Sequence, residues 1–150
     1  MTARVHPGET PGSWACNGLL KFLLSSDPRA KLLLSEFVFK IIPMLNPDGV
    51  YRGFYRSDTY GKNLNRVYLN PSAAESPTVF AVNKLVDYYA QNIYFYIDLH
   101  AHGCKKGTFL FGNQMDYRET IEAFHFAKLM ELNCVNFELD QSSFNDKNLV

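Results

Sequence analysis

Two short apolar runs, at positions 37–43 and 93–99, restrict the fold of this chain more than any other feature. Their sequences, FVFKIIP and IYFYIDL, are rich in the aromatic and β-branched residues that favour buried strands. Longer segments in which apolar residues recur at helical spacing lie before, between and after these runs. Because helices and strands alternate along the chain, we expect an α/β fold.

Four helices are expected. The first runs from Thr10, as its N-cap, to about Leu24, and the second begins at Pro28. The third and fourth cover residues 76–90 and 117–133, where apolar residues repeat on one face. Ligands in α/β folds bind beyond the carboxyl ends of strands, so the residues that follow the second apolar run are candidates for a site.

The composition excludes several classes of protein. Hydrophobic residues make up 47%, which is typical of a globular chain. The 15 basic and 15 acidic residues balance, which argues against a nucleic-acid partner. No apolar run approaches the roughly 20 residues that span a bilayer, and no signal peptide opens the chain. The three cysteines are widely spaced, which argues against a disulfide framework and favours a reducing compartment. We therefore expect a soluble cytoplasmic protein with no membrane partner.

One long irregular segment separates the second helix from the third. Residues 46–49 (NPDG) predict a turn, because proline presets one φ and glycine tolerates a positive φ. From residue 50 to 71 no periodicity is present, and the segment is rich in Tyr, Arg, Asn and Gly. Loops of this length in compact domains are usually functional or disordered.

A metal site is indicated by histidine and glutamate residues. His6 and Glu9 form an H-x-x-E pair that one loop could present to one ion, although this spacing alone often arises by chance. His100 and His102 follow at the end of the second predicted strand. Two close ligands and one distant histidine form the pattern of a catalytic zinc site with an open fourth position. Both histidines lie on the same side of a strand, so either could be the distant ligand.

Arginines in the irregular segment suggest recognition of a carboxylate. Arg56 and Arg66 lie between the two parts of the metal motif. The guanidinium group binds two carboxylate oxygens through paired N–H bonds, and a second arginine can stabilise a developing oxyanion. An enzyme that removes a terminal amino acid must recognise a free carboxylate, so these residues fit an exopeptidase.

Four motifs in this order resemble those of the zinc carboxypeptidase family: HPGE, PMLNPDG, NLNR and DLHAH. The residues of these motifs most resemble those of the cytosolic branch of the family, whose members trim glutamates from tubulin tails. The similarity runs from residue 4 to about 148. It implies a partial mixed β-sheet with flanking helices, and it identifies residues 1–150 as part of a zinc carboxypeptidase domain.

The resemblance also assigns roles to individual residues. It implies one Zn²⁺ ion held by His6, Glu9 and His100. Arg56 would be the catalytic arginine on the oxyanion side. The terminal carboxylate of the substrate would be bound by Asn65 and Arg66, and His102 would line the pocket without binding zinc.

Asn63 differs from the pattern of the secreted relatives. They have at this position an aspartate that supports the first zinc histidine. The side-chain oxygen of Asn63 could still accept the imidazole N–H of His6. Because this partner is neutral, we expect His6 to be a weaker donor to the metal.

Two parts of the family pattern have no counterpart in this sequence. The general base of the family is a glutamate well beyond the DLHAH motif, and cytosolic members carry a β-rich domain ahead of the peptidase domain. We therefore expect a fragment, nearly inactive by itself, of a carboxypeptidase that removes glutamate from polyglutamylated tubulin or other protein tails. Loss of a general base typically costs about 10²–10⁴ in rate. Lys105 and Lys106 could attract an acidic tail, but two solvated loop lysines explain them better.

Three alternatives remain open. The chain could be an inactive zinc-binding module that holds acidic C-terminal tails. It could also belong to a zinc acylase of N-acyl amino acids, which shares the H-x-x-E and distant-histidine arrangement. A structural zinc site at His100, His102 and Cys104 is a weaker alternative, because such sites usually have four cysteine or histidine ligands.

Overall fold

The computed structural model describes residues 1–113 and 116–144 of the chain. These residues belong to two units, Met1–Ala101 and His102–Val150. The last part of the family similarity noted above, residues 145–148, lies outside the described residues.

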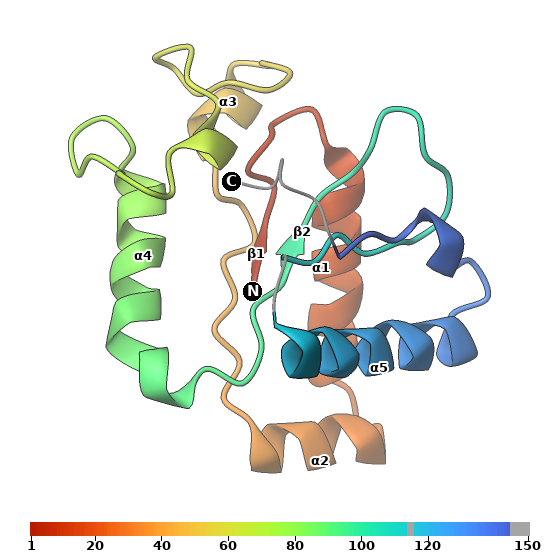
Figure 1. Cartoon of the computed structure of the whole chain (residues 1–150). Helices are drawn as coiled ribbons and strands as arrows, with labels where there is room; N and C mark the ends of the chain where they lie inside the picture. The colour runs from red at the N-terminus through yellow and green to blue at the C-terminus, as the bar shows by residue number, and fades with distance from the viewer. Residues whose placement is uncertain (114–115, 145–150) are drawn as a thin grey trace. The chain divides into compact units, whose positions relative to one another are not determined.

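The first unit is organised around β1 (Thr2–Ala3), which pairs in parallel with β2 (Asp98–Leu99). On its other side β1 forms a parallel bridge to Ile42, and the N–H of Leu45 donates to the carbonyl of Ala3 at 2.9 Å. β1 therefore runs between the segment around Ile42 and β2 (Figure 1). Because the three segments run in the same direction, the residues that follow them emerge at one edge, where the α/β fold places ligand sites.

The two predicted buried strands are wrong in extent and in burial. Only Asp98 and Leu99 of the second run form a strand, and the first run contributes a single bridge. Val38 and Tyr94, one from each run, are 83% and 80% exposed. The pairing is short because β1 has two residues, which lie opposite Asp98 and Leu99, so residues 93–97 lie before the part of the run that β1 pairs with.

Three helices of the first unit confirm the predictions: α1 (Thr10–Leu23), α2 (Pro28–Glu36) and α4 (Pro77–Tyr89). Each has a proline in its first turn, where the missing N–H costs nothing. The predicted N-cap of α1 is wrong, because Glu9 rather than Thr10 occupies that position. Figure 1 shows α1 and α4 on opposite sides of the strands, which confirms the α/β class.

The core of this unit lies directly beside the residues that carry the motifs. It consists of buried side chains from the loop after β1, the segment before α3, η1 (Leu64–Arg66) and α4: Val5, Leu45, Leu64, Val79 and Val82. Val5 precedes His6, and Leu45 precedes Asn46. Close packing of these neighbours fixes the backbone from which the motif side chains extend.

The predicted turn at residues 46–49 is instead the start of a short helix, α3 (Pro47–Tyr51). The side-chain oxygen of Asn46 accepts from the N–H of Gly49 at 3.0 Å and caps this helix. Gly49 is helical, so the tolerance of glycine for a positive φ is not used there. A Cβ at Gly49 would lie 2.5 Å from Pro7 Cγ and 2.8 Å from the Ser57 carbonyl, so glycine allows two loops to approach the helix closely.

The second unit contains α5 (Tyr117–Asn133), as predicted, and η3 (Leu139–Gln141). Parallel bridges join Thr108 to Phe137 and Phe111 to Ser143. The apolar residues aligned along α5 are largely exposed, and Ala127 is its one fully buried residue among those described. None of the described helices has the length and hydropathy needed to cross a bilayer. The 3₁₀ helix η2 (Ala90–Asn92) follows α4 in the first unit.

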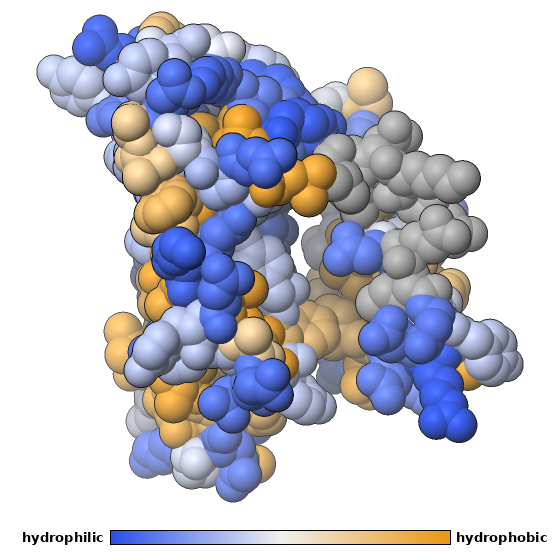
Figure 2. All heavy atoms as spheres, turned by 60° about the vertical axis from the view of Figure 1, so that its left-hand side comes forward, coloured by the Kyte–Doolittle hydropathy of each residue, from blue (hydrophilic) through white to orange (hydrophobic). Residues whose placement is uncertain are grey.

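Apolar side chains also reach the surface elsewhere. Figure 2 shows apolar residues, in orange, open to solvent among the polar ones on the face in view. The exposed aromatic and aliphatic residues of the first unit include Val38 and Tyr94, and the rings of Phe37 and Tyr94 lie 5.2 Å apart. Two extended segments of this unit thus present apolar side chains next to one another.

Candidate metal centre

The loop between β1 and α1 carries the first two candidate ligands. His6 is buried, with 2% of its surface exposed, and Glu9 lies immediately before the first turn of α1. The N–H of Gly8 donates to the carbonyl of Tyr55 at 2.7 Å. A Cβ at Gly8 would lie 2.6 Å from the Tyr55 ring and 2.8 Å from that carbonyl. Glycine is required here because the loop lies directly against residue 55.

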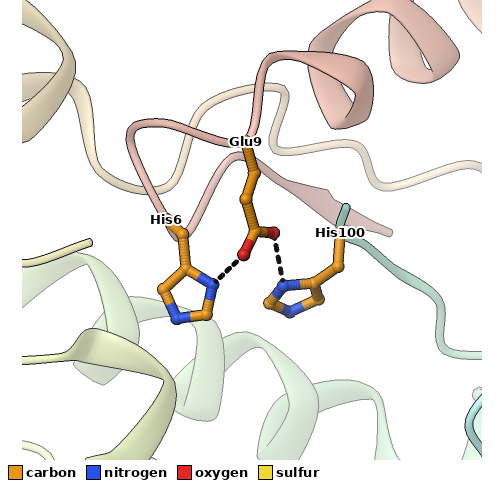
Figure 3. A group of neighbouring side chains, drawn as sticks. All are labelled: His6, Glu9 and His100. Carbon is orange, nitrogen blue, oxygen red and sulfur yellow. Dashed lines mark hydrogen bonds and ion pairs between the residues drawn. The ribbon is translucent and has the colours of Figure 1, made fainter. Parts of the chain in front are cut away.

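Glu9 lies between two imidazole rings (Figure 3). Its Oε1 is 2.7 Å from Nδ1 of His6, and its Oε2 is 2.9 Å from Nδ1 of His100. The N–H of Ala101 also donates to Oε2, at 2.9 Å. The structure therefore brings together three residues that are separated by up to 94 positions, and their ligand atoms lie within 4.8 Å of one another.

The far side of the His6 ring is held by Asn63. The Asn63 Oδ1 atom lies 2.9 Å from His6 Nε2, and it also accepts from the backbone N–H of Asn65 at 3.0 Å. Since a backbone N–H requires an acceptor, the second contact supports the assignment of this atom as oxygen. His6 Nε2 therefore donates to Asn63, and Nδ1 faces Glu9 at the centre. The predicted contact between Asn63 and His6 is confirmed.

His100 has an analogous support that the sequence reasoning did not identify. Its Nε2 lies 2.9 Å from Asp98 Oδ2, and the hydroxyl of Thr2 donates to Asp98 Oδ1 at 2.8 Å. Asp98 was part of the DLHAH motif but had no role assigned. The available signal was its spacing, because residues two apart in a strand point to the same side.

The charges at the centre strongly perturb two titrating groups. Burial by itself would raise the pKa of Glu9, but hydrogen bonds from His100, His6 and the N–H of Ala101 hold this pKa well below its usual range. Burial would lower the pKa of His100, but its hydrogen bonds to Asp98 and Glu9 raise that pKa to about 9. The centre thus stabilises positive charge between its ligand groups.

These observations fit a zinc ion. Two imidazole nitrogens and a carboxylate form a donor set of catalytic zinc sites. Both rings direct Nδ1 toward the same carboxylate, and oxygen acceptors fix the opposite nitrogens, as is usual for metal-binding histidines. In the part of the chain that the structure describes, no other three histidine, cysteine or carboxylate side chains bring their ligand atoms this close together.

Arg56 lies beside this group of ligands. Its Nη1 is 3.7 Å from Glu9 Oε1, and its side chain is about half exposed. The loop that carries it is held by the buried Asp58, whose carboxylate accepts from the backbone N–H groups of Tyr60 and Lys62. The structure therefore places one predicted arginine next to the centre with its guanidinium still accessible.

Asn65 and Arg66 lie in η1, next to the Asn63 that contacts His6. The Arg66 guanidinium is exposed and donates through Nη1 to the carbonyl of Asn65 at 3.0 Å. Contact between this segment and His6 brings the predicted carboxylate-binding residues into the neighbourhood of the centre. Their roles in substrate binding stay predictions.

His102 belongs to the second unit. Its ring lies edge-on to Phe109, with centroids 5.9 Å apart, and its Nδ1 accepts from the N–H of Cys104 at 3.2 Å. His100, not His102, shares the group with His6 and Glu9. The described residues contain no cluster that would support a structural zinc site at Cys104. The pocket role of His102 stays a prediction.

Comparisons with known proteins give one consistent result. Residues 1–114 match the Peptidase_M14 family model, described as zinc carboxypeptidase. The chain is 43% identical to cytosolic carboxypeptidase 6 of Mus musculus over 150 residues, which covers 97% of this chain and 28% of that protein. It is 48% identical to cytosolic carboxypeptidase 4 of the same organism over 124 residues, which covers 81% of this chain and 11% of that protein. The chain therefore spans less than a third of the length of these relatives.

Solved structures show the same similarity. A putative carboxypeptidase A from Shewanella denitrificans superposes with a TM-score of 0.89 at 32% identity, over 97% of this chain and 40% of that one. A metallo-carboxypeptidase from Burkholderia cenocepacia gives a TM-score of 0.87 at 29% identity, over 99% of this chain and 40% of that one.

Proposed function

Because the chain belongs to the zinc carboxypeptidase family, we propose that His6, Glu9 and His100 hold the zinc ion of an enzyme that removes C-terminal amino acids from proteins. The observation that carries this proposal is the convergence of the three side chains on one point, with Arg56 beside them. We place the protein in the cytoplasm, in line with the names of its relatives. Residues 1–150 would then form part of a zinc carboxypeptidase domain.

Each residue has a definite task in this proposal. A zinc ion at the centre would supply Lewis-acid activation of water and of the scissile carbonyl. Asn63 and Asp98 keep the two imidazole rings oriented through their Nε2 atoms. The accessible guanidinium of Arg56 stabilises negative charge that develops on the carbonyl oxygen.

Substrate recognition is assigned to the NLNR segment. Asn65 and Arg66 bind the terminal carboxylate, since Arg66 is exposed and guanidinium pairs with carboxylate through two N–H groups. His102 lines the pocket. We propose polyglutamylated tails, above all those of tubulin, as substrates; the similarity to cytosolic carboxypeptidases supports this choice.

We propose that the 150-residue chain by itself hydrolyses its substrate slowly. Among the described residues, the carboxylates in contact with the histidines are Glu9 and Asp98, and both are engaged by ring nitrogens. Neither is free to act as general base. The lack of a general base typically lowers the reaction rate by a factor of about 10²–10⁴. The same observation favours a second candidate, a module that binds acidic tails without cleaving them.

Metal content is the first test. Zinc per chain is measured by mass spectrometry of the metal in purified wild type, His6→Ala and the control His125→Ala, which changes an exposed histidine of α5. We expect about one zinc per chain in the wild type and the control, and little in His6→Ala. A wild-type chain without zinc would contradict the proposal.

Substrate binding is the second test. A peptide that ends in several glutamates is titrated into the zinc-loaded chain, and released glutamate is measured in parallel. Arg66→Ala should weaken binding at least about tenfold, because charge-assisted hydrogen bonds to the carboxylate are lost. Arg29→Ala, a change in α2, should bind like the wild type. Fast glutamate release that a chelator abolishes would overturn the proposed low activity of the chain.

A further inference from the structure

Arg4 has an unusual backbone. It is the one residue other than glycine with a positive φ in the described chain, at +58°. The left-handed conformation is unfavourable for a residue with a Cβ, and it persists only where surrounding contacts compensate for it. Arg4 lies two positions before His6, at the point where β1 turns into the ligand loop.

The side chain of Arg4 contacts two parts of the first unit, and its backbone carbonyl contacts a third. Its Nε donates to the carbonyl of Pro7 at 2.7 Å, and its Nη1 donates to Ser13 Oγ at 2.8 Å. Pro7 lies inside the ligand loop, and Ser13 lies in the first turn of α1. The Arg4 carbonyl also accepts from the N–H of Asn46 at 3.2 Å.

The two side-chain contacts point in different directions, which a guanidinium group can achieve and a lysine ammonium cannot with the same fixed geometry. Glycine would adopt the left-handed conformation at lower cost. The chain nevertheless has arginine there, so the side-chain contacts offset the backbone cost. Neither contact involves a residue to which the proposed reaction gives a role.

We propose that Arg4 is a positioning residue for the metal centre. It turns the backbone out of β1 and ties the loop to α1, so that His6 and Glu9 face the same point. The inference rests on the proposed zinc function, but the ordering of the loop is a property of the metal-free chain as well.

The test compares Arg4→Ala, Arg4→Gly, Arg4→Lys and Ser13→Ala in the full chain. Zinc affinity is measured by competition with a chromophoric chelator. Hydrogen exchange of the Gly8 amide is measured without metal, because this amide donates to Tyr55 at the back of the loop. Ala30→Gly is the control, since it lowers stability at a buried position of α2, outside the core cluster that contains Val5.

We expect Arg4→Ala and Arg4→Gly to bind zinc about 10- to 100-fold more weakly, the range found when groups that support ligands are removed. The Gly8 amide should exchange faster in both variants. Arg4→Gly should unfold at a higher temperature than Arg4→Ala, because glycine relieves the backbone cost. Arg4→Lys and Ser13→Ala should give smaller losses of affinity, and they serve as the test if Arg4→Ala does not fold.

Unchanged zinc affinity and unchanged exchange of the Gly8 amide in the Arg4 variants would overturn the proposal. So would an equal loss of zinc affinity in Ala30→Gly, since the effect would then be a general loss of stability. A wild-type chain that binds no zinc would instead overturn the proposed function, and amide exchange alone would then decide whether Arg4 orders the loop.

Discussion

At the scale of single residues, Glu9 joins the two histidines of the centre, His6 and His100. Each of its carboxylate oxygens contacts a different histidine, and those histidines lie on segments that follow β1 and β2. It is also the residue that precedes α1, where its side chain makes no capping hydrogen bond. The carboxylate is thus used by the centre and not by the helix, which is why the usual preference for a capping residue failed to predict this position.

The site was predictable in its residue types but not in its supports. His6 and Glu9 followed from their chemistry and spacing, whereas the choice of His100 over His102 and the contact of Asn63 came from the resemblance. The contributions of Arg4 and Asp98 depend on a backbone conformation and on hydrogen bonds that residue types do not reveal. Gly8 likewise has no signature in the sequence, because its importance arises from the nearby carbonyl of Tyr55.

Gly8→Ala is expected to weaken zinc binding about tenfold or more, within the range for loss of a supporting group. The added Cβ would lie 2.8 Å from the Tyr55 carbonyl, so the loop must move and carry its ligands away from Arg56. Zinc affinity is measured by chelator competition. Gly18→Ala is the control, because it lies in α1 with nothing within 4 Å of the new Cβ. The control should keep its affinity and melt slightly higher, since alanine favours helix. Equal affinities in the two variants would contradict this prediction.

At the scale of elements, helices and strands differ in how far local signals determine them. Prolines and apolar periodicity located α1, α2, α4 and α5 to within a few residues. A helix satisfies its backbone hydrogen bonds within one segment, so local sequence is sufficient to predict it. A strand needs a partner from elsewhere, and β1 is too short to pair with all of either apolar run. The two runs are rich in β-forming residues but mostly lack such a partner.

At the N-terminus of α2, the stabilisation that one capping residue gives to the fold depends on pH. The side chain and the backbone N–H of Arg29 both donate to Asp27, and they lower the pKa of that carboxyl to about 2. Because the folded pKa lies below the unfolded value of about 3.9, the charged carboxylate stabilises the fold above about pH 4. This contribution is lost as the pH falls toward 2.

Asp27→Ala should therefore lower the melting temperature by roughly a few degrees at pH 6, as the loss of an N-cap does. The difference from the wild type should shrink near pH 2.5. Thermal unfolding of the metal-free chain at both pH values measures the effect. Asp87→Ala, an exposed change in α4, should have little effect at either pH. If Asp27→Ala lowers the melting temperature as much at pH 2.5 as at pH 6, the role of the Asp27 charge is refuted.

At the scale of the whole molecule, exposed apolar side chains determine how copies of the chain behave in solution. Phe37, Val38 and Tyr94 lie on segments whose backbone is extended but largely unpaired in the described structure. Exposed apolar patches and unpaired strand edges both favour association.

We expect the isolated chain to self-associate as its concentration rises through the micromolar range. Sedimentation velocity should show an increasing apparent mass, and the double variant Val38→Ser, Tyr94→Ser should stay closer to a monomer. Tyr51→Ser is the matched control, because Tyr51 is 91% exposed but lies on α3, away from the two segments. A wild-type chain that remains monomeric at every concentration would disprove the expectation.

The distance along the chain between the ligands has a thermodynamic consequence. Glu9 and His100 are 91 positions apart, so an unfolded chain keeps two of the three ligands of this centre, His6 and Glu9, close together but not the third. Bringing in the third ligand requires closure of a long loop, which folding provides and a random coil does not. Zinc would therefore bind the folded chain far better than the unfolded chain, and so would stabilise the folded state. Once the folded state is saturated, each tenfold increase in free zinc would add about 1.4 kcal/mol to the free energy of unfolding. Zinc supply would then help determine how long each copy of the chain survives in a cell that degrades unfolded protein.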